Sequence, residues 1–141
     1  MPDLPTWAAG LGLQPHPEGG WYAETYRHDG SLDTPAGTRS LGTAIHFLLN
    51  TGESSAWHRV SSDELWFHHR GGPLRLFLGG DREEPGRVTE QVLDGVGTFQ
   101  VIVPAGFWQA ARPVDQAVLV SCVVVPGFDF ADFTLGGPAP S

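Results

Sequence analysis

The apolar residues of this chain occur in short runs that are separated by polar, glycine- or proline-containing turns. Within most runs apolar and polar positions alternate, as expected for strands with one buried face. No stretch has the sustained three-to-four-residue apolar spacing that marks a long amphipathic helix. The pattern therefore predicts strands at residues 20–27, 43–49, 56–60, 64–69, 74–78, 88–93, 99–103 and 117–125.

The turn residues support an all-β fold. The 19 glycines and 12 prolines are spread along the chain rather than gathered in one tract, which is typical of a sandwich or barrel. Strands in this number predict a jelly roll or a closed barrel. Residues 5–11 are expected to form one short N-terminal helix, and residues 28–38 an exposed loop. We expect a single domain over residues 1–141, with a core at about 11–135 and a frayed tail at 136–141.

Two of the predicted strands, residues 43–49 and 117–125, are apolar on both faces. One face can fill the interior of the barrel. The other would leave a large apolar patch in water, which monomeric proteins rarely do. This predicts either a homodimer with a self-complementary interface or an extra covering sheet.

Charge and composition narrow the choice of partners. The 16 acidic and 8 basic residues give a net charge of −8, which disfavours nucleic acid and anionic membrane surfaces. No apolar run approaches the length of a bilayer span and no secretory leader pattern is present, so a cytoplasmic protein is expected. The single cysteine, Cys122, lies in an apolar run and is expected to be a buried apolar side chain rather than a nucleophile.

One set of residues has a spacing that points to a defined site. Gly52 is followed after five residues by His58, after one by Val60, after three by Glu64 and after six by Gly71, and residues 104–109 read Pro-Ala-Gly-Phe-Trp-Gln. These segments resemble the two motifs of the cupin superfamily, with Val60 and Gln109 in place of two histidines. The resemblance implies a cupin-type double-stranded β-helix, the small jelly roll, in which His58, Glu64 and Gln109 share one internal pocket.

Further segments resemble one family within this superfamily, cupin-5 (DUF985). They comprise residues 19–27, 43–45, 58–60, 63–66, 103–111 and 126–130. The resemblance implies a jelly-roll homodimer. Members are commonly labelled predicted sugar epimerases, by analogy with a jelly-roll epimerase of deoxysugar nucleotides, although one fold hosts many chemistries.

The motif positions also bear on metal binding. In metal-binding cupins the four corresponding positions hold three histidines and one glutamate. In this chain Val60 carries no donor atom and Gln109 is a weak neutral ligand, whereas a transition-metal site normally needs three good donors. We therefore expect no metal and no other cofactor. The alternative is a metal-dependent enzyme that uses His58, Glu64 and a recruited His68.

Strand alternation places Trp66 and His68 on the same face as Glu64, so these side chains are expected to share a pocket with His58 and Gln109. A base, an acid, an aromatic floor and an amide suit a polar, ring-shaped small molecule. The catalytic candidates are His58 and Glu64, and the substrate-binding candidates are Trp66, His68, Gln109, Trp108, Tyr22, Glu24 and Arg59. The structural alternatives are a buried His58–Glu64 pair that only holds a hairpin together, packing for Trp108 and a dimer contact for Glu24.

The remaining histidines and arginines are less informative. His46 is expected in the core or an interface, while His16 and His28 are expected to be solvated. Arg39 and Arg59 are candidates for binding a substrate carboxylate or phosphate, with a surface ion pair as the alternative.

Three functions remain open from the sequence. The first is a metal-independent epimerase or isomerase of a sugar-like or carbonyl compound, in which His58 or Glu64 removes a proton, the other group returns one, and Gln109 stabilises the enolate. The second is a non-catalytic small-molecule binder that uses the same pocket. The third is the metal-dependent cupin enzyme.

Overall fold

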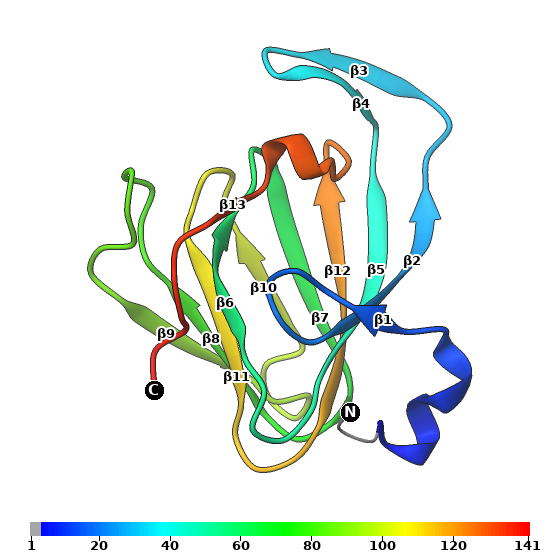
Figure 1. The fold of residues 1–141 in the computed structure, drawn as a ribbon, viewed down its shortest axis with the longest axis vertical. Coiled ribbons are helices and arrows are strands. Elements are labelled where there is room, and N and C mark those ends of the chain that lie inside the picture. Colours follow the sequence, from blue (N-terminus) through cyan, green and yellow to red (C-terminus); the bar gives the residue numbers. More distant parts are fainter. Residues whose placement is uncertain (1–3) are drawn as a thin grey trace.

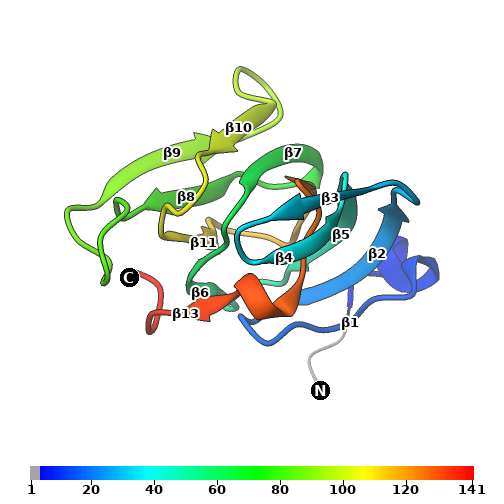
Figure 2. The same cartoon turned by 90° about the horizontal axis from the view of Figure 1, so that it is seen from above.

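The computed structural model describes residues 4–141 and arranges their strands in two antiparallel sheets around a shared interior (Figure 1, Figure 2). The first sheet has the order β1 (Gln14–Pro15), β2 (Trp21–Arg27), β5 (Thr43–Leu49), β12 (Val118–Val125), β7 (Asp63–Gly71) and β10 (Gln100–Val103). The second has the order β13 (Thr134–Leu135), β6 (Ser55–Arg59), β11 (Gln109–Pro113), β8 (Leu74–Leu78) and β9 (Thr89–Leu93). A hairpin of β3 (Ser31–Thr34) and β4 (Gly37–Ser40) projects beyond one end of the barrel. This is the predicted all-β jelly roll.

The alternation of apolar and polar residues locates most strands to within two residues, and the 3-10 helix η1 (Thr6–Leu11) is the predicted short N-terminal helix. Two features differ from expectation. The β3–β4 hairpin occupies most of the predicted loop at 28–38 and extends to Ser40, and it was missed because its small and polar residues carry no alternating pattern. Strand β11 reads Gln-Ala-Ala-Arg-Pro, a weak strand sequence, and is extended because β6 and β8 pair with it on both sides.

The inward-facing side chains change character along each long strand. On β12, Val118 and Val120 belong to the main apolar core, Cys122 lies at its edge and also lines a cavity, and Val124 lines the cavity. The same division occurs on β5, where Phe47 and Leu49 pack in the core and Thr43 and Ile45 line the cavity. One half of the barrel is therefore filled by side chains and the other half is open to a ligand.

The N-terminal segment covers part of the outer face of the first sheet. Ala8 of η1 packs against Trp21, Leu48 and Leu119, together with half-buried apolar residues of the same segment. Part of the apolar outer face predicted from the sequence is thus covered within the chain. No helix within residues 4–141 is long and apolar enough to cross a membrane.

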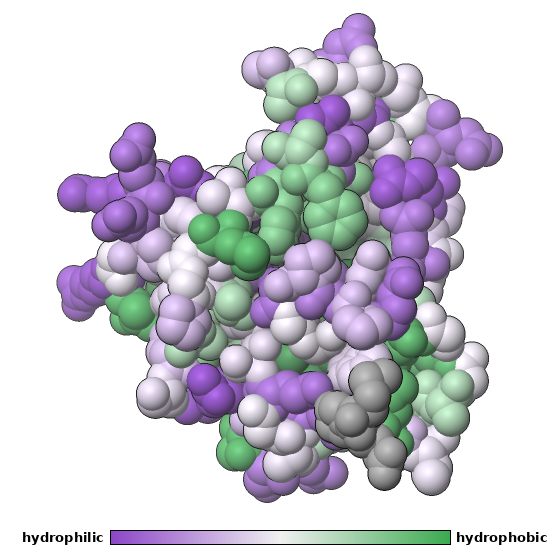
Figure 3. Space-filling view, viewed as in Figure 1, coloured by the Kyte–Doolittle hydropathy of each residue, from purple (hydrophilic) through white to green (hydrophobic). Residues whose placement is uncertain are grey.

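The C-terminal segment crosses the open half of the barrel. It forms η2 (Phe130–Asp132) and then β13, and Figure 3 shows apolar side chains gathered over this region. Arg39 on β4 donates two hydrogen bonds of 2.8 Å to the Asp132 carboxylate, which ties η2 to the β3–β4 hairpin. The tail, expected to be frayed, instead lies against the second sheet, where the Gly136 amide donates to the Trp57 carbonyl at 2.7 Å and Arg112 donates to the Pro140 carbonyl at 2.9 Å.

Candidate functional site

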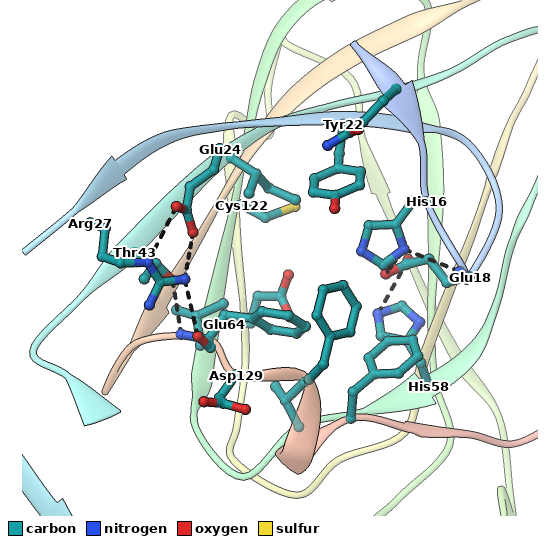
Figure 4. A pocket seen from close by; sticks show the side chains of 17 residues that line it. His16, Glu18, Tyr22, Glu24, Arg27, Thr43, His58, Glu64, Cys122 and Asp129 are labelled. Atoms are coloured by element: carbon teal, nitrogen blue, oxygen red, sulfur yellow. Dashed lines mark hydrogen bonds and ion pairs between the residues drawn. The ribbon is translucent and has the colours of Figure 1, made fainter. Parts of the chain in front are cut away.

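The open half of the barrel contains a cavity of about 480 Å³. Its ionisable lining residues fall into two groups in Figure 4, with Glu64 between them in this view. His16, Glu18 and His58 lie on one side, and Glu24, Arg27 and, lower in the view, Asp129 on the other. Apolar side chains complete the wall: Tyr22, Ile45, Val60, Val124, Phe128, Phe130 and Phe133.

A glycine-rich turn before β2 brings Glu18 into the cavity. Gly19 and Gly20 have φ values of +106° and +76°, a region that favours glycine. A Cβ atom on Gly19 would collide with the Ser54 carbonyl, and one on Gly20 would lie 2.8 Å from the Leu48 carbonyl. The turn therefore packs closely against the neighbouring strands, and the Ala56 amide fixes it by donating to the Glu18 carbonyl at 2.8 Å.

The Glu18 carboxyl is buried among polar groups. The Ser55 hydroxyl donates a short hydrogen bond to it, and its two oxygens lie 3.3 Å from His16 Nδ1 and 3.4 Å from His58 Nε2. Burial raises the pKa of Glu18 from 4.5 to about 8, although the Ser55 hydrogen bond opposes this effect. Glu18 is therefore mainly protonated at neutral pH.

Both imidazoles beside Glu18 are held neutral. Burial, with a smaller effect of His58, lowers the pKa of His16 from 6.5 to about 4. Burial also lowers the pKa of His58, against opposing effects of Glu64 and the Ala56 carbonyl. His58 Nδ1 lies 2.7 Å from that carbonyl, which can only accept, so Nδ1 carries the proton and Nε2 presents a lone pair toward Glu18.

Glu64 is positioned by a buried hydrogen-bond chain. The Trp66 indole donates to Gln109 Oε1 at 2.8 Å, and Gln109 Nε2 donates to Glu64 Oε1 at 2.9 Å. Burial raises the pKa of Glu64 from 4.5 to about 7, while His58 and the hydrogen bonds from Gln109 and Cys122 act in the opposite direction. Near neutral pH this carboxyl is therefore present in both protonation states.

The other side of the cavity carries an ion pair. Arg27 donates from Nη2 to Glu24 Oε1 at 2.6 Å and from Nε to Glu24 Oε2 at 3.2 Å, and Nη2 also donates to the Phe128 carbonyl at 3.3 Å. The side chains of Glu24 and Arg27 are 41% and 47% exposed, so this pair lies toward solvent, unlike Glu18 and Glu64.

The structure brings several sequence-predicted site residues together. His58, Glu64, Tyr22 and Glu24 all line the cavity. Gln109 does not line it and lies behind Glu64, with both ends of its amide already hydrogen-bonded. Trp66, with which it pairs, belongs to the apolar core.

The structure places three expected pocket residues elsewhere. His68 follows Glu64 by four residues, about 13 Å along a strand, so it lies beyond the core, where its Nε2 is 2.8 Å from the Gly72 carbonyl. Trp108 and Arg59 alternate with Gln109 and His58 and therefore project from the opposite face of the second sheet. There the Arg59 guanidinium lies 4.6 Å from the centre of a Trp108 ring.

Two important residues were not predicted from the sequence. His16 was expected to be solvated but is buried, and Glu18 was not identified as a site residue. A carboxylate directly before two adjacent glycines was the available signal, because such a turn can fold into a cavity. Cys122 also lines the cavity, and burial followed by the charges of Glu64 and Glu18 raises the pKa of its thiol well above 9.0, so it remains protonated.

Residues 5–136 match the model of the cupin-5 family, described as the cupin superfamily (DUF985). The chain belongs to this family. The resemblance seen in the sequence motifs is therefore confirmed, and the cupin fold is one that commonly binds small ligands.

This cupin is similar in sequence or in structure to several known proteins. Protein SO0799 from Shewanella oneidensis is 35% identical in sequence to this chain. Its crystal structure matches with a TM-score of 0.82 over 96% of this chain and 85% of that one. The uncharacterized protein YML079W of Saccharomyces cerevisiae is 30% identical over 84% of this chain and 68% of its own length. Oxalate decarboxylase from Lactobacillus farciminis, at 19% identity and a TM-score of 0.63 over 90% of this chain and 34% of that one, shares the fold alone.

The residues at the cupin motif positions do not fit a metal ion. Val60 lines the cavity without a donor atom, and both ends of the Gln109 amide are engaged by Trp66 and Glu64. Across residues 4–141 no group of three or more His, Cys, Asp or Glu side chains is arranged to hold a metal. The recruited third ligand of the metal-dependent alternative, His68, lies beyond the core from Glu64.

Proposed function

We propose that this cupin is a metal-independent isomerase or epimerase that acts on a small, ring-shaped carbonyl compound. One observation carries the proposal. Two buried carboxyls, Glu18 and Glu64, have pKa values raised to about 8 and about 7, and they face the same cavity as the neutral imidazoles of His16 and His58. Groups that change protonation near neutral pH are those that acid–base catalysis requires.

We assign distinct roles to these groups from their positions in the cavity. Glu64 projects from β7 and His58 from β6, so they approach a ligand from the two facing sheets. The Glu64 carboxylate removes a proton from the carbon beside the carbonyl, and the electron pair forms an enolate. The protonated Glu18 carboxyl donates a hydrogen bond to the carbonyl oxygen. His58 Nε2 lies 3.4 Å from Glu18, close enough to accept this proton later in the reaction.

His58 Nε2 takes the Glu18 proton and returns it to the opposite face of the carbon. This leaves Glu64 protonated and Glu18 ionised, and net transfer of one proton from Glu64 to Glu18 through solvent restores both carboxyls. In this scheme Glu18, rather than Gln109 as the sequence suggested, donates the hydrogen bond to the enolate oxygen. Gln109 instead acts as a positioning residue, because its hydrogen bond holds one oxygen of Glu64 and leaves the other to face the cavity.

The test is solvent-proton exchange, which does not require the product to be known. A panel of ketoses, aldoses and cyclic lactones is incubated with the protein in D₂O, and deuterium beside the carbonyl is detected by NMR. We expect one class to exchange, and Glu64→Gln to abolish that exchange while the surface control Glu83→Gln retains it. If panel members bind but none exchanges, the result favours the non-catalytic binder. If a chelator abolishes exchange and added metal restores it, the result favours the metal-dependent enzyme.

We also propose that the chain forms a homodimer through the outer face of the first sheet. Ile102 on β10 alternates with the core residues Val101 and Val103, so it projects from the outer face, where it is 54% exposed. It lies at the opposite edge from the part that η1 covers. Association of two such faces would remove this apolar surface from water.

A further inference from the structure

The positive charge available to a ligand in the cavity is small. Within the described chain, Arg27 is the only lining side chain with a permanent positive charge. Its Nε and Nη2 atoms already hold both oxygens of Glu24, the geometry by which a guanidinium would bind a carboxylate or phosphate of a ligand. An anionic ligand could therefore use the Nε–Nη2 edge of Arg27 only by displacing Glu24, and the Nη1 group alone cannot form the same two-point contact.

The other two arginines that the sequence suggested for anion binding also interact with other residues. Arg39 forms two hydrogen bonds of 2.8 Å with Asp132. Arg59 lies against Trp108, on the opposite face of the second sheet from the cavity. Neither lines the cavity.

The buried side of the cavity offers no compensating charge. His16 Nδ1 accepts a hydrogen bond from the Glu18 amide at 3.1 Å, so a second proton on this ring would break that contact. His58 Nε2 faces Glu18 rather than open solvent. An anionic group placed here would lose its hydration and lie near the Glu64 carboxyl, which is partly ionised near neutral pH, and this is unfavourable.

The wall of the cavity suits an uncharged ring. Phe128, Phe130 and Phe133 pack edge-to-face with ring centres 4.8–6.2 Å apart, and Tyr22 contacts His16 at 4.6 Å. These aromatic groups adjoin the protonated Glu18 carboxyl and the His58 Nε2 acceptor. An apolar wall with a few converging hydrogen-bonding groups is the usual composition of a site for a neutral ligand.

We infer that the ligand of this cavity is an uncharged ring compound, and that the site selects against compounds bearing a phosphate or carboxylate. This inference rests on the proposed function and narrows its substrate class. It separates this cupin from epimerases of nucleotide-linked sugars, because a diphosphate would need cationic partners that the cavity lining does not supply. The preference for an uncharged ligand arises as much from the unfavourable environment that an anionic compound meets in the cavity as from attraction of the uncharged compound.

The test uses two probes with one ring and different charge, benzamide and benzoate, with thymidine diphosphate glucose as a nucleotide-sugar probe. Binding to the full chain is followed at pH 7.5 and low salt by NMR shifts of the His16, His58 and Tyr22 rings. We expect benzamide to bind at least about tenfold more tightly than benzoate, since only benzoate brings an unpaired charge beside the carboxyls. Thymidine diphosphate glucose should leave these resonances unchanged.

Two variants of equal charge change provide the control. Glu24→Gln releases Arg27 and should tighten benzoate binding relative to benzamide binding by about threefold or more. Glu83→Gln, outside the cavity, should change neither. Benzoate or the nucleotide sugar binding as tightly as benzamide overturns this inference but leaves the acid–base function in place. No shift with any probe at millimolar concentration overturns the ligand-binding cavity itself, and with it the proposed function.

Discussion

Replacing Glu18 by glutamine should stabilise the protein increasingly as the pH rises. Glutamine keeps the size of the side chain and an oxygen that accepts from the Ser55 hydroxyl, but it cannot ionise. In the parent protein at high pH, the buried carboxyl must either stay protonated, which costs free energy when protons are scarce, or carry an unpaired charge inside the barrel. The difference between the two proteins therefore isolates the cost of this group.

The magnitude follows from the displaced pKa. The pKa of Glu18 is about 8 in the folded chain against an ordinary value of 4.5. Because the unfolded chain loses this proton first, the stability that the neutral carboxyl contributes is fully present below pH 4.5 and is lost as the pH rises toward 8. At about 1.4 kcal/mol for each tenfold change in proton affinity, the loss reaches about 5 kcal/mol.

The assay is urea-induced unfolding of the parent protein, Glu18→Gln and Glu83→Gln at half-unit steps from pH 5 to pH 8.5. The free energy of unfolding of Glu18→Gln should rise relative to the parent across this range and level off above pH 8, whereas Glu83→Gln should follow the parent. A Glu18→Gln difference that varies by less than about 1 kcal/mol over the range would refute the reasoning, since the carboxyl would then ionise as it does in water.

The catalytic proposal predicts a bell-shaped pH dependence for deuterium exchange, because the base Glu64 is ionised above about pH 7 and the acid Glu18 is protonated below about pH 8. Exchange rates measured from pH 5.5 to 9.5 should peak between these values, and a monotonic profile would contradict the assignment. Trp66→Phe removes the indole donor to buried Gln109 and leaves a small void, so urea unfolding should show a loss of about 2–4 kcal/mol; a change close to zero would mean that the chain behind Glu64 contributes no stability. Light scattering at micromolar concentration should give about twice the 15.2 kDa chain mass, and a single-chain mass would contradict the proposed dimer.

The residues by themselves determined most of the strands and the centre of the site. The alternation of apolar and polar positions is a local property of the chain, so it identifies a strand wherever one face is buried. The resemblance of the segment from Gly52 to Gly71 to the first cupin motif likewise implied that His58 and Glu64 lie near one another, and the short turn between the two strands that carry them is consistent with this. The weak strand β11 escaped this reasoning, since its neighbours rather than its sequence hold it extended.

Only the tertiary structure decided which polar groups share the cavity. Glu18 enters because the turn at Gly19 and Gly20 packs against Ser54 and Leu48, about 30 residues further along the chain, a contact with no periodic signal in the sequence. Alternation gave the correct face for His68, but the apolar core fills that part of the barrel and separates His68 from Glu64. Strand patterns specify which way a side chain points, whereas the packing of distant segments determines whether it meets a core, a cavity or solvent.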